Sequence, residues 1–575
     1  MRKGIALLLS VLLFSLGALG GCGTGGSGEA DTAQEEKKEV QLDNFLEEAV
    51  YDFSYEKPKE SPHILINRNG YATEADKVAF FSGKELPKQF EVVRKETREV
   101  VFRGSIGDTE YDEEDGTYFA KGDFTGLKEE GTYYLQAELI GQSYSFEILD
   151  DRYDAIYDKI LESFYYHRCG STLNGESELN NHRACHMQAT MLEGTEQEPD
   201  TVGGWHTDNS FNKDVVESTK MMSDLMLTYE FLHTGSGSGL DMEEELESMQ
   251  TLLSEVLYEV VFLLKLQDSK TGAFYSGVRS REPVTVTNPE QDQRTFYVAA
   301  ADDEATAECA AVLAQFSRIY RQIDAQMSAA CLEAAAKAFQ YLEKQGVEND
   351  ITYYAACELY KTTGNAKYSQ YILQYVQKSA NADKQNPSGD TRAKAVSNRE
   401  KVSGTLSGNS ADARAGKSQT GAGVQPEGVE EENESSVRFD RRIYGDIAYL
   451  TTTYKVNTDL CAEFMDTLMS RAEEISAAAK KDTYLVYREG DVRSSQVILE
   501  GAFVLAIIDH IVTSHEYIGV IENQLDYLFG RNELGENLVT NKGVLGGAFE
   551  EDHYDLYLQS TLVFILHELI EREAD

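Results

Sequence analysis

The sequence predicts two folded domains, a β-sandwich followed by an all-α domain. The chain has 575 residues, of which 41% are hydrophobic, so it is too long for one ordinary domain and apolar enough to fill a sizeable core. The spacing of its apolar residues also changes along the chain. They alternate with polar residues before about residue 150, and from there on they follow a helical period.

The N-terminal segment is typical of a secreted protein. Two basic residues precede an apolar run from Ile5 to Leu19, and a Leu-Gly-Gly-Cys sequence ends at Cys22. The run is shorter than the ~20 residues that a bilayer-spanning helix needs, and no later stretch is predicted to span. Residues 1–22 are therefore predicted to be a signal peptide. Its end resembles the lipobox of bacterial lipoproteins, which implies a lipid anchor on Cys22 at the extracellular face of the membrane. An ordinary cleaved signal is the alternative.

The charge of the chain limits its partners. The formal net charge is −46, from 53 basic and 99 acidic residues. Such a surface repels nucleic acid phosphates and anionic lipids, so we expect no nucleic acid partner. Neutral glycans or cations fit better.

The predicted β-sandwich covers residues 63–150 and follows a polar tether at 23–62. In the sandwich region, Tyr144, Phe146 and Ile148 alternate with polar residues, and glycines punctuate the short predicted strands. The tether is rich in Gly, Ser, Ala and charged residues and cannot bury enough apolar surface to fold. An all-β sandwich of roughly 90 residues is the expected result.

The all-α domain is predicted to cover residues 151–575. Apolar residues at helical spacing indicate about twelve helices, the number that six helical hairpins require. They lie near 152–168, 213–235, 241–267, 302–320, 324–346, 350–363, 366–380, 439–454, 458–481, 495–513, 515–530 and 555–572. Residues 381–436 contain no aromatic residue and are predicted to be a disordered insertion between two helices.

Four motifs of the chain are Gly-Gly-Trp-His at 203–206, Tyr-His-Arg-Cys-Gly at 166–170, His-Arg-Ala-Cys-His at 182–186 and Gly-Arg-Asn at 530–532. Together they resemble motifs of glycoside hydrolase family 9, the cellulase family. Residues 64–71 and 122–133 resemble the immunoglobulin-like domain that precedes many catalytic modules of this family. The resemblance implies an immunoglobulin-like β-sandwich followed by an (α/α)6 barrel. It also implies an open cleft for a β-1,4-linked glucan and hydrolysis with inversion.

The resemblance places the catalytic base in the segment after His206. Inversion needs two carboxyls ~6.5–9.5 Å apart, one to activate water and one to protonate the leaving oxygen. The family sequence at this point is Asp-Ala-Gly-Asp, and its two carboxylates fall on Thr207 and Ser210 here. A hydroxyl cannot replace a carboxylate as base without a strong activator. Asp208 is the candidate replacement, and a loop carboxylate that caps the following helix is the alternative.

The position of the catalytic acid also differs from the family pattern. The resemblance places His553 where the family has a glutamate, with Glu550, Glu551 and Asp552 beside it. An active glycosidase would therefore use Asp208 as base and Glu551 or His553 as acid. The alternatives are a glycan-binding surface protein without catalysis and a structural module that has abandoned sugars.

Four residues are candidates for contacts with the glycan. Trp205 is the only tryptophan, and sugar rings stack on aromatic side chains in glycan clefts. His206, Arg531 and Asn532 lie in motifs shared with the family.

A metal site is also implied by the resemblance. Cys169, Cys185 and His186 resemble ligands of a structural zinc site in some family members, with His206 or His182 as the fourth ligand. Two thiolates and two imidazoles suit tetrahedral zinc. A Cys169–Cys185 disulfide and two reduced core cysteines are the alternatives. Bound calcium is implied by the family alone.

Overall fold

The computed structural model describes residues 63–112, 116–175, 180–232, 242–385, 440–489, 494–512, 515–538 and 556–574. The predicted tether and most of the predicted insertion, residues 386–436, lie outside the described residues. So do Cys22 and residues 550–553, which include the candidate acids.

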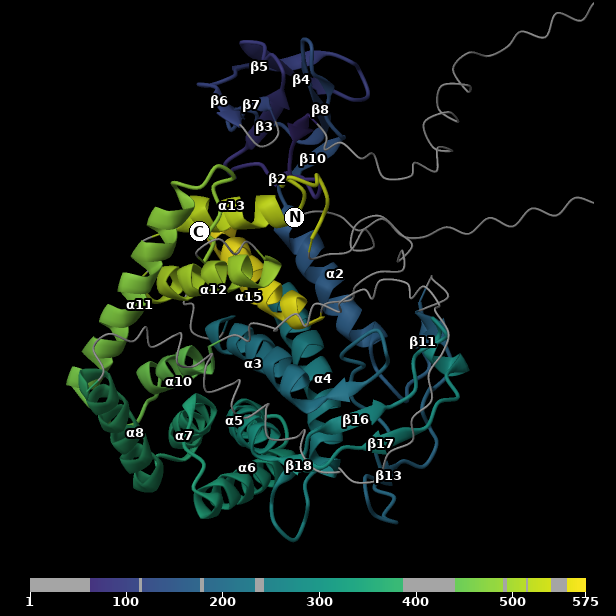
Figure 1. The fold of residues 1–575 in the computed structure, drawn as a ribbon, viewed down its shortest axis with the longest axis vertical. Coiled ribbons are helices and arrows are strands. Elements are labelled where there is room, and N and C mark those ends of the chain that lie inside the picture. The colour runs from purple at the N-terminus through teal and green to yellow at the C-terminus, as the bar shows by residue number, and fades with distance from the viewer. Residues whose placement is uncertain are drawn as a thin grey trace, which may run out of the picture. The chain divides into compact units, whose positions relative to one another are not determined.

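The first described part of the chain is a two-layer β-sandwich (Figure 1). One sheet has the order β1 (Ile64–Leu65), β3 (Val78–Gly83), β7 (Thr117–Asp123), β6 (Glu110–Asp112). The other has the order β2 (Tyr71–Ala72), β10 (Phe146–Leu149), β8 (Gly131–Ala137), β4 (Gln89–Arg94), β5 (Val100–Ser105), with β9 (Gly141–Gln142) beside β8. Alternate residues such as Phe81, Phe90 and Leu135 point inward and form the core between the sheets.

Twelve α-helices follow among the described residues, which confirms the predicted all-α domain. They are α2 (Arg152–Tyr166), α3 (Val215–Leu232), α4 (Met242–Lys265), α5 (Asp303–Tyr320), α6 (Ala325–Gln345), α7 (Asp350–Thr363), α8 (Ala366–Gln385), α10 (Arg441–Leu450), α11 (Thr458–Ala479), α12 (Ser495–Val512), α13 (Ile518–Leu528) and α15 (Leu556–Ala574).

Six of these helices form an inner ring. Helix α3 contacts α5, α5 contacts α7, and α7 contacts α10. In the other direction α3 contacts α15, and α15 contacts α12. The ring closes between α10 and α12, where the rings of Tyr444 and Phe503 stack 5.3 Å apart. The other six helices pack outside, each beside an inner helix, so the domain is an (α/α)6 barrel.

Short strands connect the helices near the start of α3. Strand β14 (Lys213–Asp214) pairs with β16 (Gly277–Ser280), which pairs with β17 (Phe296–Val298) and through it with β13 (Met191–Leu192). Two further pairs join β11 (Leu173–Asn174) to β12 (Asn181–His182) and β15 (Phe274–Tyr275) to β18 (Ala301–Asp302). A 3₁₀ turn, η1, covers Pro289–Gln291.

Buried ion pairs join the inner helices. Arg441 Nη2 of α10 lies 2.5 Å from Glu308 Oε2 of α5, and both side chains are nearly inaccessible. Arg318 Nη2 of α5 lies 2.5 Å from Glu230 Oε1 of α3. Removing one partner of such a pair leaves a buried charge, which costs far more than losing the contact itself. The pairs therefore fix the inner helices against one another.

Two sequence expectations need correction. Helix α8 continues to Gln385, so residues 381–385 of the predicted insertion are helical. The polar composition of residues 381–385 predicts disorder, but alanine, lysine and glutamine are also good helix formers. Helix α12 is long and apolar enough to pass for a membrane span, contrary to expectation, but 72% of it is buried. The helix is apolar on all sides because it is an inner helix, surrounded by other helices of the barrel.

The sandwich and the barrel share a polar junction. Asn67 Nδ2 donates to Asp526 Oδ1 at 2.8 Å, and Arg531 Nη1 lies 3.0 Å from Asp526 Oδ2. The Arg531 guanidinium also lies over the Phe80 ring of β3, 4.9 Å from its centre. Arg531 is fully buried, so the junction is a packed interface and not a surface contact.

Two carboxyls at this junction retain protons to unusually high pH. Burial, and then the charge of Asp526, raises the pKa of Glu522 from its ordinary value of 4.5 to about 7. Burial also raises the pKa of Asp526 to about 6, against the effect of Arg531. The folded protein therefore binds more protons here than the unfolded chain between about pH 4.5 and 7.

We predict that Glu522 makes the protein less stable as the pH rises through this window. The stabilisation is fully present below the unfolded value and is lost as the pH passes about 7. Glu522→Gln mimics the protonated form. Relative to this variant, the wild-type free energy of unfolding should fall by roughly 3 kcal/mol from pH 4.5 to 7. Urea denaturation at several pH values measures the free energy of unfolding of both proteins. Parallel pH profiles of the wild type and Glu522→Gln would contradict the prediction.

Candidate functional site

The loop at residues 203–214 leads into inner helix α3 and is held by its backbone. Cys169 N donates to Gly204 O and His206 N donates to His167 O, each at 2.8 Å. Buried Lys213 donates from Nζ to the carbonyl of Gly203 at 3.0 Å. Gly204 has a φ of +78°, and an added Cβ would lie 2.5 Å from the Phe262 ring, so only glycine fits there. The loop therefore has one well-defined path.

Asp208 uses both carboxylate oxygens within this loop. Its Oδ1 accepts from the backbone N–H groups of Ser210 and Asn212, both at 2.9 Å, and its Oδ2 accepts from Asn212 Nδ2 at 2.7 Å. Asp208 does not cap the following helix. Asp214 does so, because its Oδ1 accepts from Val216 N at 2.9 Å. The Asp208 carboxylate therefore closes the turn.

Thr207 and Ser210 also serve the shape of the loop. Thr207 Oγ1 accepts from Asp214 N at 3.1 Å and donates to Asn212 O at 3.4 Å. The backbone carbonyl of Ser210 accepts from Arg294 Nη2 at 2.7 Å. Within the described part of the chain, no carboxylate or imidazole accepts a hydrogen bond from either hydroxyl. Neither hydroxyl therefore has the adjacent base that activates a nucleophile.

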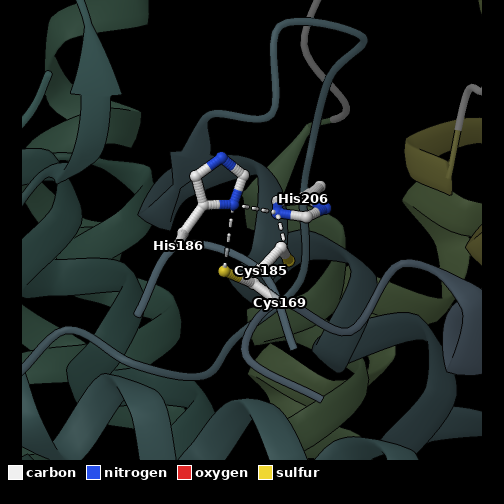
Figure 2. A group of neighbouring side chains, drawn as sticks. All are labelled: Cys169, Cys185, His186 and His206. Atoms are coloured by element: carbon white, nitrogen blue, oxygen red, sulfur yellow. Dashed lines mark hydrogen bonds between the residues drawn. The ribbon is translucent and has the colours of Figure 1, made fainter. Parts of the chain in front are cut away.

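Cys169, Cys185, His186 and His206 come together beside the loop, with their ligand atoms within 4.8 Å of one another. Figure 2 shows the four side chains converging on one point. Cys169 Sγ is 3.7 Å from His186 Nδ1, Cys185 Sγ is 3.8 Å from His206 Nε2, and the two nitrogens are 3.2 Å apart. Both cysteines are free thiols.

The spacing of this cluster fits a tetrahedral metal ion. Zn–S bonds of ~2.3 Å and Zn–N bonds of ~2.05 Å place nitrogens ~3.3 Å apart and sulfur and nitrogen ~3.6 Å apart. The observed separations are close to these values. His182 lies elsewhere, with Nδ1 2.6 Å from Arg183 O, so His206 completes the set.

The protonation states of Cys169 and His206 suit metal binding, whereas the contact with Cys169, and then burial, raises the pKa of Cys185. The contact with the Cys185 thiol lowers the pKa of Cys169 well below its usual value, against the effect of burial. Burial lowers the pKa of His206, which favours the neutral imidazole. A thiolate and a neutral imidazole are the forms that bind metals.

Asp292 and Arg294 connect the cluster to the loop. His186 Nε2 lies 3.3 Å from Asp292 Oδ2, and Arg294 Nε and Nη2 donate to the same carboxylate. Arg294 also bonds the backbone of Ser210, as described above. A carboxylate on the outer nitrogen of a histidine orients it toward a metal. The sequence did not indicate either residue, because no motif links Asp292 to His186 or Arg294 to Ser210, which lie far earlier in the chain.

Residues 153–545, more than half of the chain, match the family model described as glycosyl hydrolase family 9. This chain belongs to glycosyl hydrolase family 9. Residues 59–142 match the cellulase N-terminal ig-like domain, so the β-sandwich is the immunoglobulin-like domain that the sequence predicted.

Known family 9 proteins share this fold. A cellodextrinase from Butyrivibrio fibrisolvens is 28% identical over 334 residues, covering 53% of this chain and 59% of that protein. The chain spans about half the length of the curated relatives it matches. A metagenome-derived family 9 endoglucanase has a TM-score of 0.68 at 21% identity, covering 88% of this chain and 99% of that one. A zinc-binding triple mutant of a family 9 endoglucanase has a TM-score of 0.62 at 24% identity, covering 81% and 83%. At these identities the structures show the fold alone.

The residues predicted to contact the glycan are buried in this family 9 protein. Trp205 is 0% exposed and packs against Phe164, with ring centres 5.2 Å apart. Arg531 and Asn532 are also 0% exposed, and Asn532 Nδ2 donates to Tyr527 O at 2.7 Å. His206 belongs to the cluster with Cys169, Cys185 and His186. This placement does not fit a role in substrate binding, because fully buried side chains reach no ligand in this conformation.

A buried charge network joins helices α3 and α15 beneath the loop. Lys220 Nζ lies 2.7 Å from Asp224 Oδ2 and 3.2 Å from Ser560 Oγ. Asp224 Oδ2 accepts from Ser560 Oγ and Thr561 Oγ1, both at 2.9 Å, and Tyr444 also donates to Asp224. Lys220 and Asp224 are four residues apart in helix α3, a spacing that the sequence shows and that places the two charges on one side of the helix.

We predict that Lys220→Met destabilises the protein by about 3–5 kcal/mol, because it leaves the Asp224 charge buried and unpaired. The double variant Lys220→Met with Asp224→Asn should be more stable than the single one, since no charge is left. Urea denaturation of the four proteins of this cycle measures the coupling. Strictly additive losses would contradict the prediction.

Proposed function

We propose that this protein captures a neutral β-glucan at the bacterial cell surface without hydrolysing it. The observation that carries the proposal is the state of Asp208. Its carboxylate closes the turn between Thr207 and Asn212 and uses both oxygens in three hydrogen bonds within the loop. The resemblance to the family assigns the two other positions of the motif to hydroxyls that lack an activating base.

The choice of ligand rests on family and charge. Proteins similar in sequence carry the names cellodextrinase and endoglucanase, which supports a β-glucan as the ligand of this chain. A net charge of −46 disfavours polyanionic ligands and leaves neutral polysaccharides as the class that binds without repulsion. Lipidation at Cys22 would hold the protein on the extracellular face of the membrane.

Binding and hydrolysis are tested on the same preparation. We expect affinity electrophoresis to show retardation by mixed-linkage β-glucan or xyloglucan, with no release of reducing ends from either. Retardation should survive in Asp208→Asn, because this residue shapes the loop and does no chemistry. Cells that express the full chain should bind labelled β-glucan, and cells with Cys22→Ser should not.

Two results would overturn this proposal. Release of reducing ends that is lost in Asp208→Asn and in Glu551→Gln or His553→Asn would show a hydrolase with a displaced carboxylate pair. Absence of both binding and hydrolysis across neutral polysaccharides would show a module that has abandoned sugars.

We also propose that the cysteine and histidine cluster holds a structural zinc ion. Cys169, Cys185, His186 and His206 supply the two thiolates and two imidazoles that a closed zinc site needs. The ion would fix the segment after helix α2 to the 203–214 loop. All four positions are taken by protein ligands, so such an ion keeps the loop in shape and has no place for a substrate.

We predict about one zinc per chain in the purified protein by elemental analysis. Cys169→Ser should lose the metal and lower the melting temperature, because an unpaired polar cluster is then left in the core. Cys461→Ser, at a half-buried cysteine outside the cluster, is the matched control and should keep it. A Cys169–Cys185 disulfide, seen as two fewer free thiols in the metal-free wild type, would contradict the proposal.

A further inference from the structure

The immunoglobulin-like domain carries a polar groove on one outer face. The groove has a volume of about 530 Å³. Its polar lining consists of Gln89, Glu91, Arg103, Gln136, Glu138 and Gln142. A volume of this size lies within the ~300–1,000 Å³ of small-ligand sites.

Strand register arranges four of these side chains in one row. Gln142 of β9 is directly opposite Gln136 of β8, Gln136 is opposite Glu91 of β4, and Glu91 is opposite Arg103 of β5. Directly opposite residues point to the same face of a sheet. The row therefore crosses four strands and three strand spacings, ~14 Å in all. We call it the ladder groove.

The side chains at the centre of the ladder groove hold one another in place. Glu91 Oε1 accepts from Arg103 Nε at 2.9 Å, and Glu91 Oε2 accepts from Gln136 Nε2 at 2.8 Å. Among the described residues, these bonds use the Nε of Arg103 and the Nε2 of Gln136. The outer nitrogens of Arg103, which is 67% exposed, and the Gln136 carbonyl are left facing the groove. Both donors and acceptors therefore lie along the row.

The ladder groove lies on the side of the sandwich away from the barrel. The outer face of the other sheet packs on the barrel through Phe80 and Phe119, whose ring centres lie 5.6 and 5.3 Å from that of Tyr484. The two inner faces meet in the core of the sandwich. The face that carries the ladder groove is therefore open to solvent.

The chemistry of the row favours a neutral polyhydroxylated ligand. Amide, carboxylate and guanidinium groups are planar and can bond neighbouring hydroxyls in pairs. The central carboxylate is matched by one guanidinium, so the row has no excess positive charge for a phosphate or an acidic chain. The row also presents side chains across the strands and not the backbone edge that a bound peptide strand would use.

We propose that the ladder groove is a second carbohydrate-binding site, which takes a short segment of a neutral β-glucan chain. The proposal rests on the proposed function only for the choice of β-glucan as the ligand. A site on the immunoglobulin-like domain, separate from the barrel, would let one protein hold a polysaccharide at two points. Two-point attachment raises the overall affinity without new contacts at either site.

Isothermal titration of the full chain with cellohexaose tests the proposal. The variant Arg103→Ala/Gln136→Ala removes one guanidinium and one amide from the groove. The matched control Arg321→Ala/Gln322→Ala removes the same two groups from an exposed turn between α5 and α6. Circular dichroism confirms that both variants are folded. We expect two binding equivalents per chain for the wild type and the control, and one for the groove variant.

The stoichiometry separates this proposal from the proposed function. One equivalent in the wild type that vanishes in the groove variant would support the groove and exclude capture by the barrel. One equivalent that persists in the groove variant would overturn the groove and leave capture by the barrel. Two equivalents in every protein would also overturn the groove. No binding in the wild type would overturn both.

Discussion

The barrel depends on ion pairs that its inner helices carry into the interior. Lys220 and Asp224 of α3 bind the start of α15, and Arg441 of α10 pairs with Glu308 of α5. A lone buried charge would cost several kcal/mol, so each helix is held in the one position where its charge is matched. Helices α3 and α15 follow the two segments to which the family resemblance assigns base and acid. Their relative position is therefore set by charge pairing beneath the site and not by the groups within it.

The 203–214 loop and the cysteine and histidine cluster form one unit. The backbone bonds to Gly204 and His206, and the chain from His186 through Asp292 and Arg294 to Ser210, all act on the same few residues. Asp208 adds a turn closed by its own carboxylate. A loop this strongly determined keeps its shape whether or not it does chemistry.

The immunoglobulin-like domain is joined to the barrel on one side and open on the other. Asn67 and Arg531 meet at Asp526 in a buried junction, where the raised pKa values of Glu522 and Asp526 follow from burial. The opposite face is polar because every second residue of β4 and β8 points outward, as Glu91 and Gln136 do. The outer face of the sheet that contains β3 and β7 packs on the barrel, and strand β2 of the other sheet contacts helix α2. The outer face of β4, β5 and β8 carries the ladder groove.

The sequence by itself determined the order of the two fold classes, because a sheet that buries one face shows a period of 2 and a helix that buries one face shows a period of 3.6. The barrel and the family followed from motifs that resemble glycosyl hydrolase family 9. Cys169, Cys185 and His186 lie in such motifs, but His206 and His182 remained alternatives until the structure placed His206 in the cluster. Only the tertiary structure decided what Asp208, Trp205 and Arg531 do. Trp205 and Arg531 are buried against residues that are distant in sequence, Phe164 and Phe80. Asp208 instead bonds Ser210 and Asn212 of its own loop. The ladder groove likewise arises from strand register, which pairs residues that no local pattern connects.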